Sequence, residues 1–437
     1  MEQKQERKDG IGEEMPIKVG KVKVKGAKAT KSSLIVPEVK SILGSTTQKE
    51  LFENLKAAHT HLHAYGIFDS VSSQVDAMDD VDALEVLLSL REKKRHTVHV
   101  GMEAGANEVL TNISAQMINV LGGGEPIKIN ACIGHSRSSS YDITFLKPFS
   151  HQVAQYNFFS SLYRRTTNHF ASVHTDLTTG TTMGFKVPTR LGQYSCGLSF
   201  DCRNITDLRP DTPLPIRLHA GYGTKTSFQH SLELNLTDSP AFPSKGVRCR
   251  LSQEVATLDS FNEGKRFFKT DGDVQVNSRV PFTPLVFSSS LQAGGIFSNM
   301  ERIPISDLFF LGGPQSIRGY RLRGVGPRAG NASLGGTAFV AAGAHLFSPL
   351  PYISSDRFRL HLFATGGSLL SETPSRHSPL SRTARLFQRE FAWSYGVGLA
   401  VNVGVGRIEF NYCFPRPGEV QSSPLQGLHV GLGINFL

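Results

Sequence analysis

Arg318 is the residue of this 437-residue chain whose surroundings point most directly to a functional role. It lies in the phrase F-F-L-G-G-P-Q-S-I-R-G-Y at residues 309–320, within a glycine-dense segment. A guanidinium carries five donors and a permanent charge, and glycines let a backbone fold back and pack closely. The segment therefore predicts either a loop anchored by a buried arginine or a flexible surface loop with a solvated one. The candidate loop residues are Gly312, Gly313, Ile317, Arg318, Gly319, Tyr320, Gly326 and Pro327.

Residue patterns typical of catalysis or cofactor binding do not occur in the sequence. The phosphate-binding pattern G-x-x-x-x-G-K-[ST] is absent, and no glycine cluster opens a helix after a strand. His345, His361 and His429 lie on alternating segments without an H-E-x-x-H pattern or a triad context. The cysteines are widely spaced, with no C-x-x-C pair. We therefore expect no enzyme, no cofactor and no metal site.

Charge and hydropathy limit the possible environments of the chain. The 47 Lys and Arg against 37 Asp and Glu suit an anionic membrane surface or a nucleic acid equally well. The basic residues are scattered singly without interleaved aromatics, so we expect no nucleic-acid partner. No apolar run reaches the roughly eighteen residues that a transmembrane helix needs. That absence and the mean hydropathy of −0.18 are both compatible with a membrane barrel, whose strands alternate lipid-facing and lumen-facing residues.

The chain beyond residue 95 has the period-two alternation that is typical of strands. At residues 393–404, large apolar side chains alternate with Gly, Ser, Ala and Asn, and the pattern recurs at 407–414 and 428–436. About 340 residues at roughly twenty per strand and connection predict about sixteen strands, an even count as in membrane barrels. Shorter alternating segments lie at 127–134, 232–236, 338–346 and 358–364.

The polar face of these strands distinguishes a membrane barrel from a soluble sandwich, which is the alternative. In a soluble sheet that face meets water and carries Lys, Glu or Thr, whereas here it carries small residues. Small polar residues suit a crowded, hydrated lumen. An interfacial girdle would explain aromatic residues toward strand ends, although aromatics also cap soluble cores. These aromatics are Trp393, Tyr395, Tyr412, Phe414 and Phe436.

The first hundred residues predict a small separate domain at residues 17–95. Alternating Val and Lys at 17–27 predict a strand, and a short helical stretch follows. Thr47 and Glu50 at capping-box spacing open a second helix that ends at Gly66. Strands are expected from residue 66 and across 84–90, which gives the order β-α-α-β-β. Any small α+β binding module could have this order. Residues 1–16 are expected to be a disordered tail without a targeting signal.

Several phrases of the sequence resemble a known family. G-x-F-x-x-V at 66–71 resembles a POTRA domain, the small module attached to outer-membrane assembly proteins. With the 309–320 phrase, the chain is similar over nearly its whole length to the core barrel subunits of the mitochondrial sorting and assembly machinery, in the outer-membrane insertase superfamily. The resemblance implies an all-β transmembrane barrel at 96–437 after one POTRA-like domain. Further matching phrases are V-G-P-R at 325–328, L-G-G-T-A-F at 334–339, H-L-F-S-P-L-P at 345–351, W-S-Y-G-V-G at 393–398 and N-Y-C-F-P at 411–415.

The resemblance assigns the loop around residues 312–333 a position inside the barrel. There the I-R-G-Y element would contact the inner wall, with Arg318 as its anchor. Bacterial relatives carry an aspartate in an F-x-D-x-G phrase, but this chain has Thr365 at that position, so a direct ion pair there is excluded. Glu409, on the expected lumen face, is proposed as the substitute partner.

The family function implied is insertion of β-barrel precursors into the mitochondrial outer membrane by strand pairing at a lateral seam. Glycines in the first and last strands weaken packing and would permit opening, or they only relieve crowding in the lumen. The last strand also fits the polar-x-Gly-x-x-hydrophobic-x-hydrophobic signal of mitochondrial barrels. The first-strand candidates at 97–106 are Thr97, Val98, Val100, Gly101 and Gly105, and the last-strand candidates are His429, Gly431, Gly433, Ile434 and Phe436.

The resemblance also implies partners and a location. Partners would be unfolded β-barrel precursors, membrane lipid, peripheral subunits of the machinery on the cytosolic side and an inner-membrane contact-site complex. The chain would cross the mitochondrial outer membrane many times, with its N-terminal domain in the intermembrane space. A passive outer-membrane pore, or an insertase of the same superfamily in a plastid or bacterial outer membrane, is the alternative.

Overall fold

The chain divides into two compact units in its computed structural model. The first contains the N-terminal module together with residues 114–129 and 143–160, and so extends beyond the boundary expected at residue 95. The second contains residues 100–113, 130–142 and 161–437. The described residues are 15–78, 83–104, 109–135, 137–150, 155–210, 212–239, 242–259, 264–351, 357–371, 391–403, 406–416, 422–433 and 437, so most of the expected 1–16 tail lies outside them.

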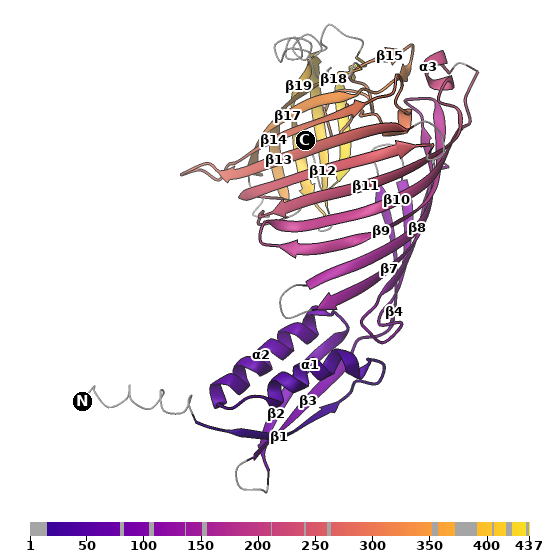
Figure 1. The fold of residues 1–437 in the computed structure, drawn as a ribbon. Helices are drawn as coiled ribbons and strands as arrows, with labels where there is room; N and C mark the ends of the chain where they lie inside the picture. The colour runs from indigo at the N-terminus through magenta and orange to yellow at the C-terminus, as the bar shows by residue number, and fades with distance from the viewer. Residues whose placement is uncertain are drawn as a thin grey trace. The chain divides into compact units, whose positions relative to one another are not determined.

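The N-terminal module has the expected order β-α-α-β-β (Figure 1). Its sheet order is β1-β3-β2, with β1 parallel to β3 and β2 antiparallel to it. The two helices cover the face of the sheet that carries Val86 and Leu88, which are fully buried. The elements are β1 Lys18–Lys25, α1 Ser32–Leu43, α2 Gln48–Ala64, β2 Phe68–Ala77 and β3 Ala83–Glu92.

Helix α2 begins at the predicted cap. The Thr47 hydroxyl accepts the Glu50 backbone N–H at 3.3 Å. The return half of the capping box falls one residue earlier than the sequence pattern indicates, because the Glu50 carboxylate accepts the Thr46 N–H at 2.7 Å. The helix then buries Leu51, Leu55, Ala58 and Leu62 on one stripe against the sheet. Each fully buried leucine contributes about 1.5–3 kcal/mol to stability, so this stripe is a main support of the module.

A 16-stranded sheet follows, in which β21 and β4 are the two end strands. Every neighbouring pair from β9 to β21 is antiparallel, and β14 pairs directly with β17 across the loop at residues 299–337. The strand count confirms the expected sixteen. The strands are β4 His96–Ala104, β5 Val109–Met117, β6 Ile127–Gly134, β7 Ser139–Ser150, β8 Gln155–His169, β9 His174–Thr189, β10 Gly192–Thr206, β11 Gly221–Asn235, β12 Gly246–Leu258, β13 Lys265–Arg279, β14 Val286–Ser298, β17 Ala338–Pro349, β18 Phe358–Leu370, β19 Ala392–Asn402, β20 Arg407–Arg416 and β21 Gly427–Gly433.

The two faces of these strands have the polarity expected for a membrane barrel. On β19, Trp393 and Val397 are exposed at 44% and 52%, whereas Ser394 between them is fully buried. On β20, Phe410 is exposed while Asn411 is buried. The apolar side chains thus point outward and the small polar ones inward. Within the described part of the chain, no helix combines the length and apolar character needed to cross a bilayer.

Smaller elements lie in the connections. A short helix α3 spans Leu214–Arg217, and one 3₁₀ turn, η1, spans Ile305–Asp307 in the loop. The same loop contains a two-stranded hairpin of β15 Arg328–Ala329 and β16 Ala332–Ser333.

Candidate functional site

The loop at residues 299–337 follows its path because glycine occupies positions that other residues could not. At Gly319, φ is +79°, and an added Cβ would lie 3.2 Å from the Cβ atoms of Ser394 and Cys413 on the wall. At Gly312, φ is +103°, and an added Cβ would lie 2.9 Å from the Arg321 carbonyl oxygen. The loop therefore packs directly against the inner wall at Arg318, next to Gly319.

Arg318 is fully buried, and its guanidinium is paired on three of its nitrogens. Nε and Nη2 donate to Oε2 of Glu409 at 3.0 and 2.9 Å, and Nη1 donates to the Leu437 carbonyl at 2.9 Å. The guanidinium also lies 5.2 Å from the ring centroid of Phe363. The structure thus places Glu409, the partner proposed from sequence, in a two-donor ion pair with Arg318.

Glu409 is the centre of a buried polar network. Its Oε1 lies 2.9 Å from Nε of a second arginine, Arg407, and Asn411 Nδ2 donates to Oε2 at 2.9 Å. With two cations close by, the carboxylate has the partners that a buried charge requires. Removing Glu409 would leave two buried guanidinium groups without their shared counter-charge.

Thr365, which stands where bacterial relatives carry an aspartate, joins this network through hydroxyl groups. Its Oγ1 lies 3.2 Å from Oγ of Ser394, which in turn donates to the Arg318 carbonyl. The wall therefore contacts both the side chain and the backbone of Arg318. Arg318 therefore has no ion pair with residue 365. It has instead a neutral hydrogen-bond chain through Ser394 to Thr365, and an ion pair with the Glu409 carboxylate of β20.

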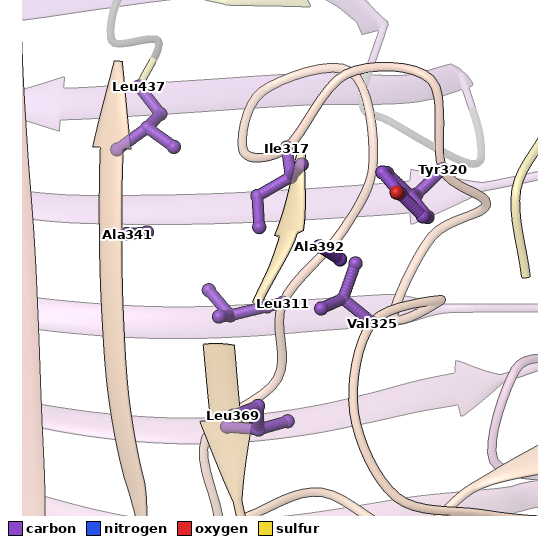
Figure 2. Close-up of a cluster of buried hydrophobic side chains, with 8 residues drawn as sticks. All are labelled: Leu311, Ile317, Tyr320, Val325, Ala341, Leu369, Ala392 and Leu437. Carbon is purple, nitrogen blue, oxygen red and sulfur yellow. The ribbon is translucent and has the colours of Figure 1, made fainter. Parts of the chain in front are cut away.

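A second part of the anchor is apolar, and Figure 2 shows its residues together. Tyr320 is fully buried, and its hydroxyl lies 2.7 Å from the Arg416 carbonyl oxygen, to which it donates. The cluster joins the loop to the wall strands by hydrophobic contact, which reinforces the ionic pairing. Its members are Leu311, Ile317, Tyr320 and Val325 from the loop, Ala341, Leu369 and Ala392 from β17, β18 and β19, and Leu437.

The loop also bonds through its backbone to the segment that leads from β20 into β21. The Leu425 N–H donates to the Gly319 carbonyl at 2.8 Å, and the Ser423 N–H donates to the Gly324 carbonyl at 2.7 Å. The Arg321 N–H donates to the Ser423 carbonyl at 3.1 Å. Together with the Leu437 contacts, these bonds connect the loop to residues on both sides of β21. The sequence carries no signal for them, because backbone pairing has no side-chain signature here.

The other predicted loop residues lie close to the anchor. Gly313 and Gly326 have φ values of +120° and +103°, and an added Cβ at Gly326 would meet Leu369 at 2.7 Å. The Pro327 carbonyl accepts the Leu334 N–H at 3.0 Å, which helps to close the β15–β16 hairpin. Sequence reasoning missed Arg407, Ser394, Asn411 and Leu437 as members of this site.

The predicted seam residues lie in the two end strands of the sheet. Thr97, Val98, Val100 and Gly101 belong to β4, and Val98 and Val100 are exposed at 66% and 71%. His429, Gly431 and Gly433 belong to β21, where His429 is buried and bonded to the Leu425 carbonyl at 2.7 Å. Pairing between β4 and β21 does not occur among the described residues. Gly105, Ile434 and Phe436 lie outside them.

Ligand-binding chemistry is not prominent in the site. Within the described ranges, no group of three or more His, Cys, Asp or Glu side chains is arranged to hold a metal ion. The polar groups instead bond to each other and to the loop. The arrangement can hold the loop against the inner face of the wall and leaves β4 and β21 as the end strands of the sheet.

The Omp85 superfamily domain matches residues 119–436, which is well over half of the chain. The chain belongs to the Omp85 superfamily. Its match includes the loop and the strands from β6 to β21, so Arg318 and Glu409 lie within the family domain. This confirms the superfamily resemblance read from the sequence.

Relatives of this superfamily chain match it nearly from end to end. The "Sorting and assembly machinery component 50 homolog" of Bos taurus is 29% identical, covering 99% of this chain and 93% of that protein. The Homo sapiens protein of the same name is 28% identical with the same coverage. The crystal structure of BamA from Haemophilus ducreyi lacking POTRA domains 1–3 has a TM-score of 0.78 at 16% identity and covers 95% of this chain and 85% of that one. That likeness supports the barrel fold.

Proposed function

We propose that this Omp85 chain inserts and assembles β-barrel precursor proteins in the mitochondrial outer membrane. The names of its full-length relatives and its 16-stranded sheet support this function. The single observation that carries the proposal is the 16-stranded sheet whose two end strands are β4 and β21. An unpaired strand edge presents a row of N–H and C=O groups that another chain can complete.

The chemistry is strand pairing and not catalysis. A precursor in the membrane must satisfy every backbone donor and acceptor, because lipid offers none. An exposed strand edge supplies those hydrogen-bond partners one residue at a time. A new strand can therefore form without leaving its backbone groups unpaired in lipid. Within β4, Gly101 has open space where a side chain would stand, which lowers the barrier to a close approach by an incoming strand.

Of the two end strands, β4 is the better template. The loop holds β21 through the residues before it, by the bonds of Leu425 and Ser423, and through Leu437 after it. In β4, Val98 and Val100 are exposed at 66% and 71%. We propose that β21 remains bound to the loop and that the last strand of a precursor pairs with β4.

The N-terminal module and the partners complete the proposal. The module would lie in the intermembrane space, where it receives or releases precursors. Peripheral subunits on the cytosolic side and an inner-membrane contact-site complex would bind the assembled barrel. The names of the relatives, which describe a component of a machinery, support the existence of such partners.

Site-specific cross-linking tests the template assignment. A photoreactive residue is placed at Val98 in β4, and a matched control at Leu198 in β10, whose side chain is 54% exposed. Each full-length variant is incubated in membranes with a radiolabelled β-barrel precursor. We expect an adduct from Val98 and none from Leu198, together with normal precursor assembly in both. Equal adducts from both positions, or none from Val98 while assembly proceeds, would contradict pairing at β4.

The passive-pore alternative predicts a different result in the same membranes. A pore would conduct ions or small solutes, yet its removal would leave precursor assembly unchanged. Loss of conductance with normal assembly in the absence of the chain would therefore favour the pore.

A further inference from the structure

Asp307 is the centre of a second buried ionic cluster. Its partners lie on strands that are distant in the sheet order from β20, where Glu409 binds Arg318. Asp307 belongs to η1 near the start of the loop and is only 3% exposed. Its Oδ2 accepts Arg203 Nη1 at 2.8 Å and its Oδ1 accepts Lys225 Nζ at 2.7 Å. Its backbone carbonyl accepts Lys269 Nζ at 2.8 Å. Three cations, from β10, β11 and β13, therefore converge on one loop residue.

The two cations that bond to the Asp307 carboxylate also have acidic neighbours on the wall. Lys225 also lies 2.6 Å from Glu254, and Arg203 lies 3.7 Å from Asp201, so both cations have one wall carboxylate each. Lys269 receives its contact from the loop itself, and its ammonium lies 4.5 Å from the ring centroid of Phe309. The loop thus adds a carboxylate, a backbone carbonyl and an aromatic ring to a wall cluster of basic and acidic side chains.

The ionised form of Asp307 is favoured by this arrangement. Burial would raise the pKa of its carboxyl, but the charges of Lys225 and Arg203 outweigh burial and hold the pKa below its ordinary value. The carboxylate therefore stays charged and keeps both charge-assisted bonds near neutral pH.

Apolar contacts surround the cluster and fix the same part of the loop. Ile305 packs in a buried group with Ile205 of β10 and Ile216 of α3. Ile303 packs in another with Phe267 of β13 and Ile296 of β14. The Asp307 carboxylate is itself shielded from water, which strengthens its bonds to the wall cations.

We propose that Asp307 is a positioning residue, which holds the base of the loop to β10, β11 and β13 so that Arg318 reaches Glu409 on β20. In the sheet order, β11 and β20 are separated by six strands, β12, β13, β14, β17, β18 and β19. The loop is consequently held at two separate sites on the wall. The role of Asp307 in precursor insertion rests on the proposed function, whereas its role in holding the loop base does not.

Limited trypsin digestion of the full-length, membrane-reconstituted protein reads the position of the loop base directly. Arg302 is exposed but is followed by the buried Ile303, so cleavage after Arg302 requires the base to detach. For Asp307→Asn we expect cleavage at least about tenfold faster, since a hydrogen bond to a charged group is worth at least the ~1.4 kcal/mol that tenfold represents. Asp307→Glu should restore slow cleavage. An unchanged rate in Asp307→Asn would overturn the proposal.

Two further variants keep the test decisive. Asp201→Asn removes a carboxylate near the same Arg203 but leaves the loop carboxylate and its bonds in place, so cleavage after Arg302 should stay much slower than in Asp307→Asn. Lys269→Met removes the bond to the Asp307 carbonyl without changing Asp307, and is the replacement test if Asp307→Asn does not fold. Faster cleavage in Lys269→Met supports the proposal that Asp307 holds the loop base to the wall, and an unchanged rate contradicts it.

Precursor insertion measured on the same samples separates the two proposals. We expect Asp307→Asn to insert precursor more slowly than wild type and Asp307→Glu to recover most of the rate. If wild type itself inserts no precursor, the proposed function fails. The cleavage rates still test whether Asp307 holds the base of the loop. If the loop base detaches in Asp307→Asn but insertion is normal, the positioning role is wrong although the proposed function stands.

Discussion

Strand β3 of the N-terminal module and strand β20 of the barrel alternate with the same period but bury opposite kinds of residue. In β3, Val86 and Leu88 are buried against two helices. In β20, Glu409 and Asn411 are buried, while Phe410 and Tyr412 are exposed at 41% and 45%. The difference lies in the surroundings, since the module meets water on its outside and the barrel wall meets lipid.

This contrast shows where each unit obtains its stability. The module gains free energy by removing apolar surface from water. The inside of the wall depends on ion pairs and hydrogen bonds such as those of Glu409, because an unmatched buried charge is costly. A polar substitution should therefore be tolerated on the outside of the module and penalised on the outside of the wall, and charge removal should matter most in the lumen.

The largest effect is expected from Glu409→Gln. It leaves Arg318 and Arg407 buried without their counter-charge, and breaking a buried pair costs about 3–5 kcal/mol. The urea midpoint of barrel unfolding should fall, and the loop should become sensitive to trypsin. Glu233→Gln on β11, where the side chain is 46% exposed, is the matched control and should change little. Unchanged stability, loop protection and assembly activity in Glu409→Gln would refute the pairing with Arg318.

In the module, Leu62→Ala should lower stability by about 2–5 kcal/mol, because Leu62 is fully buried between the helix and the sheet. Circular dichroism at a helix-sensitive wavelength should show earlier melting, whereas the heat resistance of the barrel on gels should be retained. Phe52→Ala on the outside of the same helix, at 58% exposure, provides the control. If both alanine variants melt alike, the assigned core of the module is wrong.

A pair of lysine substitutions tests the contrast between the two outsides. Val397→Lys on the outer face of β19 should cost about 2–4 kcal/mol if the residue lies near the bilayer midplane. Val36→Lys on the outside of α1, where the valine is 43% exposed, should stay within about 0.5 kcal/mol. Both are measured by urea unfolding in lipid vesicles. Equal costs would mean that the outer face of β19 does not contact lipid.

The smallest effect is a pH dependence in the module. Burial would raise the pKa of the Glu92 carboxyl, but hydrogen bonds from the Thr30 hydroxyl and the backbone N–H groups of Ala29 and Thr30 outweigh it, so its pKa is lowered. A lowered folded-state pKa gives stability that is present above the unfolded value of about 4.3 and is lost as pH falls through the folded value. Glu92→Gln should lack this acid-side decline in thermal stability. An identical decline in both proteins would exclude Glu92 as its source.

Local patterns in the sequence predicted much of this structure, because they depend on neighbours in the chain. The alternation at 393–404 predicted β19 and the direction of its faces, and the Thr47 cap predicted the start of α2. Glu409 could be proposed because it lies on the lumen side of an alternating strand. Its second cation, Arg407, lies two residues away on the same face, but nothing local indicates that one carboxylate serves both arginines.

Contacts between distant segments were not predictable in the same way. Asp307 is a single acid in an irregular loop, and its partners Arg203 and Lys225 lie on strands 104 and 82 residues earlier in the chain. The backbone hydrogen bond from Leu425 to Gly319 leaves no trace in residue type. Such contacts depend on how the loop is placed against the wall, which requires the folded sheet.

The most direct test of the central claim is to deplete this chain in cells and import a radiolabelled β-barrel precursor into their isolated mitochondria. Translocation across the outer membrane and assembly into the mature complex are scored separately, by protease protection and by native gel. The proposed function predicts that the precursor crosses the membrane and accumulates unassembled in the intermembrane space, and that added wild-type chain restores assembly. Normal assembly after depletion would contradict it.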